Sequence, residues 1–323
     1  MKSLIPLTLI NRRLNYNNIC ISLTTMNRIE PYKLRLFPFI EWRATIVNIA
    51  RSDAEKAFNK TRSASHWIPF WVGLMDGDGS IQVNHWRAKY LQYRIVIKLK
   101  NTPANEQMLQ FLSNILKAGR VRIDAKQGFV IWVEDNKRNI QKCITIFEQY
   151  PPLTSRLQCQ LLFIQYCFKS VEQNNTQLFD INVYFEERRQ KYAKQSDIIF
   201  TMAPQKLLAL SYFNSWLSGF IEAEGCFCVK NKNNSLVKNS YSFSISQKGD
   251  SYLLYAIRHF LGASNKVRVV KNDLFLIEIY SKIVLQFLEK HFIEYPLLGE
   301  KKILCKYFLR RFLKINKIFS IAF

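Results

Sequence analysis

The chain has 323 residues, 48% of them hydrophobic, which is enough for two domains with buried cores and excludes a disordered chain. It carries 47 Lys and Arg against 24 Asp and Glu, a formal net charge of +23. That surplus predicts a polyanionic partner, most simply nucleic acid, although a merely basic soluble protein is the alternative. No apolar run reaches membrane-spanning length, so no membrane partner is expected; residues 161–168, LLFIQYCF, predict a buried helix.

The cysteines and histidines do not form a recognisable metal or disulfide pattern. Seven cysteines are spread along the chain without a CxxC pair, and none of the four histidines falls in a metal-binding pair. This spacing argues against a disulfide framework and against a zinc site. Reduced thiols in a reducing compartment fit the pattern best.

The N-terminal extension, residues 1–60, has no counterpart elsewhere in the chain, and its role is open. Residues 1–29 contain four basic side chains and no acid, which is typical of an organelle transit segment but also of an ordinary tail. The chain is also rich in Lys, Asn, Ile, Phe and Tyr, as A+T-rich coding would give. Both features favour an organelle, the mitochondrion first and the chloroplast as the alternative.

Two units of similar pattern follow, 61–170 and 211–323, with a polar linker at 171–210 that predicts one helix. Corresponding residues keep a nearly constant separation: 146 residues from Arg122 to Arg268 and 145 from Tyr150 to Tyr295. Such a constant offset indicates duplication of a unit of roughly 110 residues. Each unit predicts the order helix, strand, strand, helix, strand, strand, helix, and therefore an α+β fold.

The predicted strands alternate apolar and polar residues. Ile81 and Val83 alternate with polar residues over 80–84, and Phe243 and Ile245 do so over 242–248. This period of two predicts antiparallel sheets with one face on the core. The other face is polar and basic, which is compatible with plain solvation or, because it recurs in both units, with a saddle for DNA.

One phrase occurs twice, WVGLMDGDGS at 71–80 and WLSGFIEAEGCF at 216–227. Small residues lie four apart in each copy, at Gly73 and Gly77 and at Gly219 and Ala223. On a helix this spacing places them on one face, where two backbones can approach closely. We therefore expect the two helices to pack against each other about a pseudo-twofold axis.

Asp78 and Glu224 end these two helices, each directly before a glycine. An acid at a helix C-terminus is unfavourable, and two such acids side by side repel each other unless a cation lies between them. Oxygen ligands without His or Cys predict Mg²⁺. A solvated Asp-Gly-Asp-Gly turn is the alternative, but its recurrence at matched positions favours the metal. An EF-hand is excluded because Ile81 and Arg87 stand where its loop needs Gly and Glu.

The repeated phrase resembles the LAGLIDADG motif of homing endonucleases in their single-chain, two-motif form. The similar residues are 71–79 and 217–225, and the resemblance extends over about 67–170 and 212–315. It implies two tandem, pseudo-twofold αββαββα units whose antiparallel sheets form a DNA-binding saddle. It also implies a monomer that is an internal pseudo-dimer.

The resemblance implies roles for specific residues. Two or three Mg²⁺ ions would be shared between carboxylates of Asp78 and Glu224 and carbonyls of Gly77 and Ala223, while Asp76 and Glu222 would be structural. Gln247 would order water, although the first unit has Leu99 there, so the two sites would be unequal. The basic residues near the scissile phosphates would be Arg156 and Lys301. The expected DNA contacts are Ser80, Gln82, Asn84, Arg94, Lys98, Lys100, Arg122, Lys230, Lys232, Ser244, Ser246, Lys248 and Arg268.

The activity that the resemblance implies is a metal-dependent double-strand break in DNA, with short 3′ overhangs, at a long asymmetric target. An alternative on the same fold is an RNA maturase that assists splicing of its own group I intron. A DNA-binding protein without cleavage is a third alternative, but it would require loss of a motif acid, and both acids are present.

Overall fold

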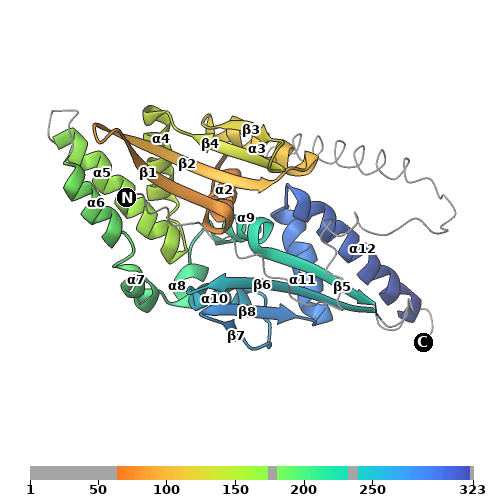
Figure 1. Ribbon diagram of the computed structural model, residues 1–323. Helices are drawn as coiled ribbons and strands as arrows, with labels where there is room; N and C mark the ends of the chain where they lie inside the picture. Colours follow the sequence, from red (N-terminus) through yellow and green to blue (C-terminus); the bar gives the residue numbers. More distant parts are fainter. Residues whose placement is uncertain (1–63, 174–179, 232–238, 321–323) are drawn as a thin grey trace, which may run out of the picture.

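The computed structural model describes residues 64–173, 180–231 and 239–320 (Figure 1). The N-terminal extension and the predicted DNA contact Lys232 lie outside the described residues. No helix in the described part of the chain is long and apolar enough to cross a membrane.

The two units repeat the same order of elements, which confirms the predicted duplication. The first unit consists of α2 (Ala64–Asp78), β1 (Gly79–Trp86), β2 (Tyr90–Lys100), α3 (Pro103–Leu116), β3 (Arg120–Asp124), β4 (Phe129–Glu134), α4 (Lys137–Gln149) and α5 (Ser155–Gln173). The second consists of α9 (Phe213–Glu224), β5 (Gly225–Asn231), β6 (Asn239–Lys248), α10 (Ser251–Phe260), β7 (Arg268–Lys271), β8 (Leu274–Ile279), α11 (Lys282–Glu294) and α12 (Glu300–Ser320).

Each unit ends in two helices where the sequence pattern predicted one. In the first unit Pro151 and Pro152 separate α4 from α5, because proline lacks the N–H that a continuing helix needs. The second unit has the same break between α11 and α12, at residues 295–299.

Each unit contains one four-stranded antiparallel sheet. The strand orders are β1-β2-β4-β3 and β5-β6-β8-β7, so the two sheets have the same topology. Their registers also match, since Gly79 pairs with Ile97 and Gly225 with Ile245. The predicted α+β class with paired antiparallel sheets is therefore confirmed.

The pair α2 and α9 lies between the two sheets (Figure 1). The central residues of both helices are buried, including Trp71 and Trp216. Trp71 stacks on Phe147 of α4 with ring centroids 4.9 Å apart, and Trp216 stacks on Phe220 at the same distance. The core of each unit therefore meets that of the other along these two helices.

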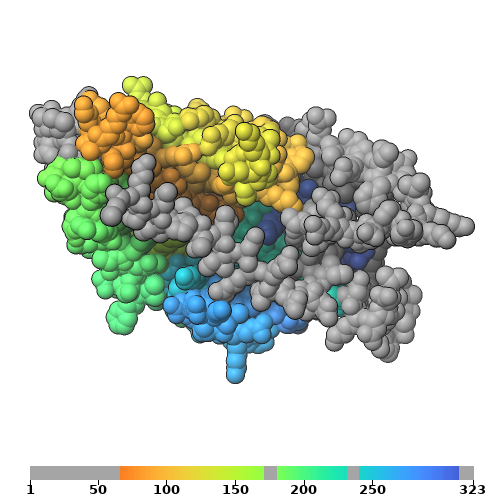
Figure 2. Space-filling model, in the orientation of Figure 1, coloured from red at the N-terminus to blue at the C-terminus, as the bar shows by residue number. Residues whose placement is uncertain are grey.

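The segment between the units contains three helices, so the prediction of one helix in the linker was wrong. They are α6 (Ile181–Gln190), α7 (Gln195–Thr201) and α8 (Pro204–Leu208). Asp180 begins α6 by accepting hydrogen bonds from two N–H groups of its first turn, and the buried Tyr184 donates to the carbonyl of Val83 on β1. The linker, green in Figure 2, borders both the first and the second unit. It therefore covers the edge of β1 as well as joining the units.

Candidate active site and nucleic-acid interface

The C-terminal ends of α2 and α9 bring Asp78 and Glu224 together. A Cβ added to Gly77 would overlap the Cβ of Ala223 and lie 3.3 Å from Cγ of Glu224. The side chain of Glu224 therefore lies against the last turn of α2, next to Asp78. This close approach needs glycine on one helix and tolerates alanine on the other.

Electrostatics in this acidic centre favour bound cations. The pKa of Glu224 is raised to about 7, first by burial and then by the charge of Asp78, against the opposing charges of Arg156 and Lys301. Burial also raises the pKa of Asp78, against the charges of Lys301 and Arg156. Two carboxylates held close together repel each other, and a divalent cation between them would relieve this repulsion.

The donors present fit a hard divalent cation. Within residues 64–173, 180–231 and 239–320, no group of three or more His, Cys, Asp or Glu side chains could hold a metal. The protein ligands would then be these two carboxylates and main-chain carbonyls, an oxygen-only set with room for water and phosphate oxygens. Mg²⁺ is usually bound in this way, through one or two carboxylates and substrate phosphates.

Arg156 and Lys301, predicted near the scissile phosphates, lie at the ends of the motif helices. Arg156 donates to the carbonyls of Asp76 and Gly79, at 2.7 and 2.8 Å, and to that of Gly77 at 3.3 Å. Lys301 donates to the carbonyl of Gly225 at 2.6 Å. Arg156 thus binds carbonyls that α2 leaves unpaired, Lys301 binds the residue that directly follows α9, and each charge offsets the negative end of a helix dipole.

The first acid of each motif is buried and binds main-chain N–H groups. Asp76 accepts from the N–H groups of Leu153 and Thr154, at 2.8 and 3.0 Å, and from Nε1 of Trp216 at 2.7 Å. The pKa of Asp76 is raised to about 6 by burial, although these hydrogen bonds oppose the rise. Asp76 thus fixes the loop that leads into α5 and Arg156.

Glu222 does the same in the second unit. It accepts from the N–H groups of Leu298 and Lys301, at 3.0 and 2.9 Å. The structural role expected for the first acids therefore has a specific form: each one holds the start of the helix that carries the basic residue.

Gln247, the predicted water-ordering residue, occupies the place of Leu99 in the first unit. Ile97 and Ile245 are equivalent because each pairs with the glycine that follows its motif acid. Leu99 lies two residues after Ile97, and Gln247 lies two residues after Ile245. Leu99 is buried, whereas Gln247 is partly exposed and its Nε2 lies 3.4 Å from Oδ2 of Asp250. The two sites therefore differ in their polar groups.

The predicted DNA contacts of the first unit share one face of its sheet, opposite the hydrophobic core. Strand pairing places Gln82 of β1 across from Arg94 of β2. Lys98 of β2 pairs with Ile131 of β4, which pairs on its other side with Arg122 of β3. Lys98 donates to Gln127 at 2.8 Å and lies over the ring of Phe129, and Lys100 lies 4.0 Å from Glu300. The predicted residues on this face are Ser80, Gln82, Asn84, Arg94, Lys98, Lys100 and Arg122.

The second sheet presents a less basic face. Cys226 and Cys228 lie on it beside a row of serines, a feature that the charge pattern did not predict. Arg268 is ion-paired with Glu278 at 2.8 Å. The predicted contacts on this face are Lys230, Ser244, Ser246, Lys248 and Arg268.

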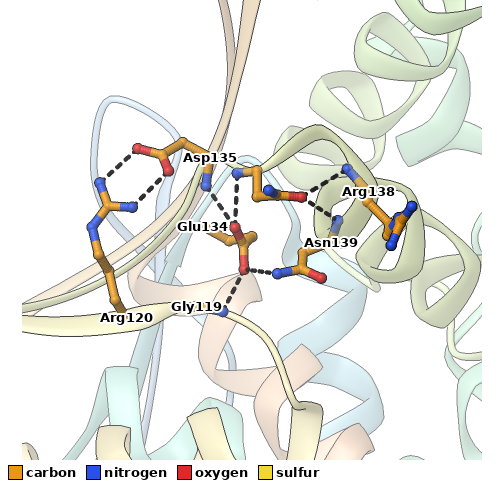
Figure 3. A network of polar contacts seen from close by, with 7 residues as sticks. Gly119, Arg120, Glu134, Asp135, Arg138 and Asn139 are labelled. Atoms are coloured by element: carbon orange, nitrogen blue, oxygen red, sulfur yellow. Dashed lines mark hydrogen bonds and ion pairs between the residues drawn. The ribbon is translucent and has the colours of Figure 1, made fainter.

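A buried carboxylate anchors the outer edge of the first sheet (Figure 3). Glu134 accepts from the N–H groups of Gly119, Asp135 and Asn136 and from the side chain of Asn139. Arg120, on the same sheet face as Arg122, makes a two-bond ion pair with Asp135. Arg120 was missed by the sequence analysis, since its place on this face depends on the pairing of β3 with β4.

Two sheets with polar outer faces, related by a central helix pair that ends in the carboxylates of Asp78 and Glu224, form a duplicated α+β fold with an acidic centre. The model of the LAGLIDADG endonuclease family matches residues 71–167 and 217–312. The chain belongs to this family.

Named relatives agree with this assignment. A probable intron-encoded endonuclease aI3 of Dictyostelium citrinum is 44% identical over 238 residues, 72% of this chain and 89% of the relative. A protein of the same description in Debaryomyces hansenii is 39% identical, over 72% of this chain and 36% of its own greater length.

Solved structures share the fold. The LAGLIDADG meganuclease I-AabMI, bound to uncleaved DNA, superposes with a TM-score of 0.60 at 20% identity, covering 77% of this chain and 92% of its own. The LAGLIDADG homing endonuclease I-LtrWI, bound to target DNA, gives a TM-score of 0.60 at 19% identity, covering 80% and 92%.

Proposed function

We propose that the chain is a site-specific DNA endonuclease that makes a double-strand break with short 3′ overhangs at a long, asymmetric target. The observation that carries this proposal is the pair of adjacent carboxylates, Asp78 and Glu224, at the ends of the helix pair between two sheets with polar outer faces. Relatives named as intron-encoded endonucleases and DNA-bound neighbours of the same fold support it.

The acidic centre would hold Mg²⁺ through Asp78 and Glu224, with the carbonyls of Gly77 and Ala223 as further ligands and two or three ions in all. One structural neighbour, I-SmaMI, is described with its DNA target in the presence of calcium ions. When bound, the metal supplies Lewis acidity to phosphodiester hydrolysis.

The side chains around this centre have separate tasks. Arg156 and Lys301 lie beside the two acids, so their charges stabilise the negative charge that develops on the phosphate. Gln247 orients the attacking water by a hydrogen bond. Because Leu99 cannot do this in the first unit, the two strands are cut at unequal rates.

The polar sheet faces bind the two halves of the target. Lys and Arg contact phosphates and make binding salt-dependent, while Gln82 and Asn84 read base edges in the major groove. Since the faces differ in sequence, the target is asymmetric. The protein acts as a monomer in the mitochondrion, where the intron that encodes it is inserted.

The maturase alternative gains no separate support from these features, because the same charge and polar faces would serve RNA as well as DNA. We place DNA cleavage first because the relatives and DNA-bound structural neighbours are named as endonucleases.

The test is cleavage of DNA that spans the intron-free junction of the host gene, with Mg²⁺ or with EDTA, on a gel that resolves both strands. Mg²⁺-dependent cutting of both strands at one position supports the proposal. An intact junction in Mg²⁺ contradicts it, and binding of the intron RNA by the same preparation would then favour the maturase.

A further inference from the structure

The start of α5, which carries Arg156, is held from both units. Asp76 of the first unit binds the N–H groups of Leu153 and Thr154, as described above. The next N–H along the chain, that of Ser155, donates to Oδ2 of Asp250 in the second unit at 3.1 Å. Asp250 is buried at the junction of β6 and α10.

A second residue of the same junction reaches this loop. The hydroxyl of Tyr252 donates to the carbonyl of Leu153 at 2.7 Å. The second unit therefore fixes both a carbonyl and an N–H of the segment that leads into Arg156.

The reciprocal contact exists on the other side of the pseudo-twofold axis. The N–H of Glu300, the first residue of α12, donates to Oδ1 of the buried Asn105 in the first unit at 2.9 Å. Lys301 follows directly and is held by Glu222 of its own unit. A Cβ on Gly299 would lie 2.6 Å from Oδ1 of Asn105, so the loop passes against this side chain.

We propose that Asp250 and Asn105 are positioning residues through which each unit aligns the catalytic cation of the other. Asp250 places Arg156, and Asn105 places Lys301. Each strand cut thus depends on a residue of the opposite unit. This inference rests on the proposed endonuclease function.

The two positioning residues are chemically different, and the difference bears on Gln247. Oδ2 of Asp250 accepts from Ser155 and also lies 3.4 Å from Nε2 of Gln247. A carboxylate can only accept here, so it fixes the Gln247 amide with its nitrogen toward Asp250 and its oxygen outward. Asn105 instead donates its Nδ2 to the carbonyl of Lys100 at 3.0 Å, and no glutamine occupies the position of Leu99. Asp250 therefore acts on both cuts and Asn105 on one.

The experiment measures the rate of cutting of each DNA strand separately, with DNA affinity in Ca²⁺ and the melting temperature recorded for every variant. D78N and E224Q first assign each strand to one unit. D250A should slow both strands and N105A only the strand assigned to the second unit, each by about tenfold or more, because small misplacements of catalytic groups are costly. DNA affinity should stay unchanged.

D250N and Y252F separate the two tasks of the second-unit junction. Asn at 250 still accepts from Ser155 but can turn the Gln247 amide round, so D250N should restore the first-unit strand relative to D250A and leave the second-unit strand slow. Y252F removes one hydroxyl and should slow the first-unit strand alone. N136A, which removes the capping side chain of α4, is the matched control and should leave the ratio of strand rates unchanged.

Equal slowing of both strands by N105A, or wild-type strand rates in both D250A and N105A, would overturn the inference while the endonuclease function stands. Cutting of both strands by D78N and E224Q would overturn the proposed function itself, and the positioning roles with it.

Discussion

Gly73 on α2 lies directly against the main chain of Trp216 on α9, and Gly219 on α9 lies in the same way against Phe70 on α2. A Cβ on Gly73 would overlap the carbonyl oxygen of Trp216 and lie 2.8 Å from the N of Phe220. A Cβ on Gly219 would overlap the carbonyl oxygen of Phe70. The distance between the motif helices, and hence between the two acids at their ends, is set by these glycines.

Alanine at Gly73 should therefore both destabilise the protein and impair cutting. The obstructing atoms belong to the main chain, so the helices must separate, and overpacking of this kind costs about 1–3 kcal/mol. Chemical denaturation of G73A should show this loss, with N214A, on the same helix pair but half-buried, as control. An unchanged free energy of unfolding in G73A would mean that the helices are not packed this closely.

Replacement of either acid should abolish the double-strand break. D78N and E224Q keep the shape of the side chain but remove the charge that holds the cation, so each variant should leave at most one nicked strand. Binding of DNA in Ca²⁺ should persist, as measured by gel shift. Full double-strand cutting by both variants would contradict the assignment of the active site.

The sequence predicted those features that recur at a fixed offset. The duplicated phrase placed Asp78 and Glu224 at the ends of paired helices, and the alternation over 80–84 and 242–248 placed the polar faces. Local pattern was sufficient there, because helix and strand periodicity depend on neighbouring residues.

The contacts made by Asp250 and Asn105 could not be predicted in this way. Asp250 precedes α10, where Asp usually caps its own helix, and Asn105 lies in the first turn of α3. Their main-chain partners, Ser155 and Glu300, lie 95 and 195 residues away in sequence. Only the packing of one unit on the other brings them together. The linker helices were missed because their polar sequence contains only two buried residues, Tyr184 and Leu207.

Metal binding should weaken as the pH falls below about 7. In the metal-free protein Glu224 has a raised pKa of about 7, so at lower pH its proton must be displaced before a cation binds. Apparent affinity for Ca²⁺ should then fall by up to about tenfold per pH unit, with release of a proton. Calorimetry of Ca²⁺ binding to the DNA complex in buffers of different ionisation enthalpy measures both. E224Q should lose the proton release, and a pH-independent affinity in the wild type would contradict this account.

Arg156 should affect stability as well as cutting. R156A removes a cation that binds the carbonyls of Asp76 and Gly77 at the end of α2 and that of Gly79 just after it. It should therefore lower the free energy of unfolding by about 1 kcal/mol in addition to slowing cleavage. K301A removes a single hydrogen bond and should slow cleavage with a smaller effect on stability. Both variants should keep DNA affinity in Ca²⁺; if affinity falls as much as the cleavage rate, these residues are phosphate contacts rather than catalytic ones.

Arg122 tests the assignment of the first sheet face to DNA. It is exposed on the face that carries Arg94 and Lys98, whereas Arg138 is exposed on α4 (Figure 3). If Arg122 contacts a phosphate, R122A should lower the slope of log affinity against log salt concentration by about 1, since each neutralised phosphate releases close to one counterion. R138A removes the same charge from the molecule as a whole and should leave the slope unchanged. Fluorescence anisotropy with a labelled target in Ca²⁺, over a salt series, gives both slopes. Equal slopes for R122A and the wild type would mean that DNA does not lie on this face, while an equal decrease in R122A and R138A would trace the salt dependence to net charge.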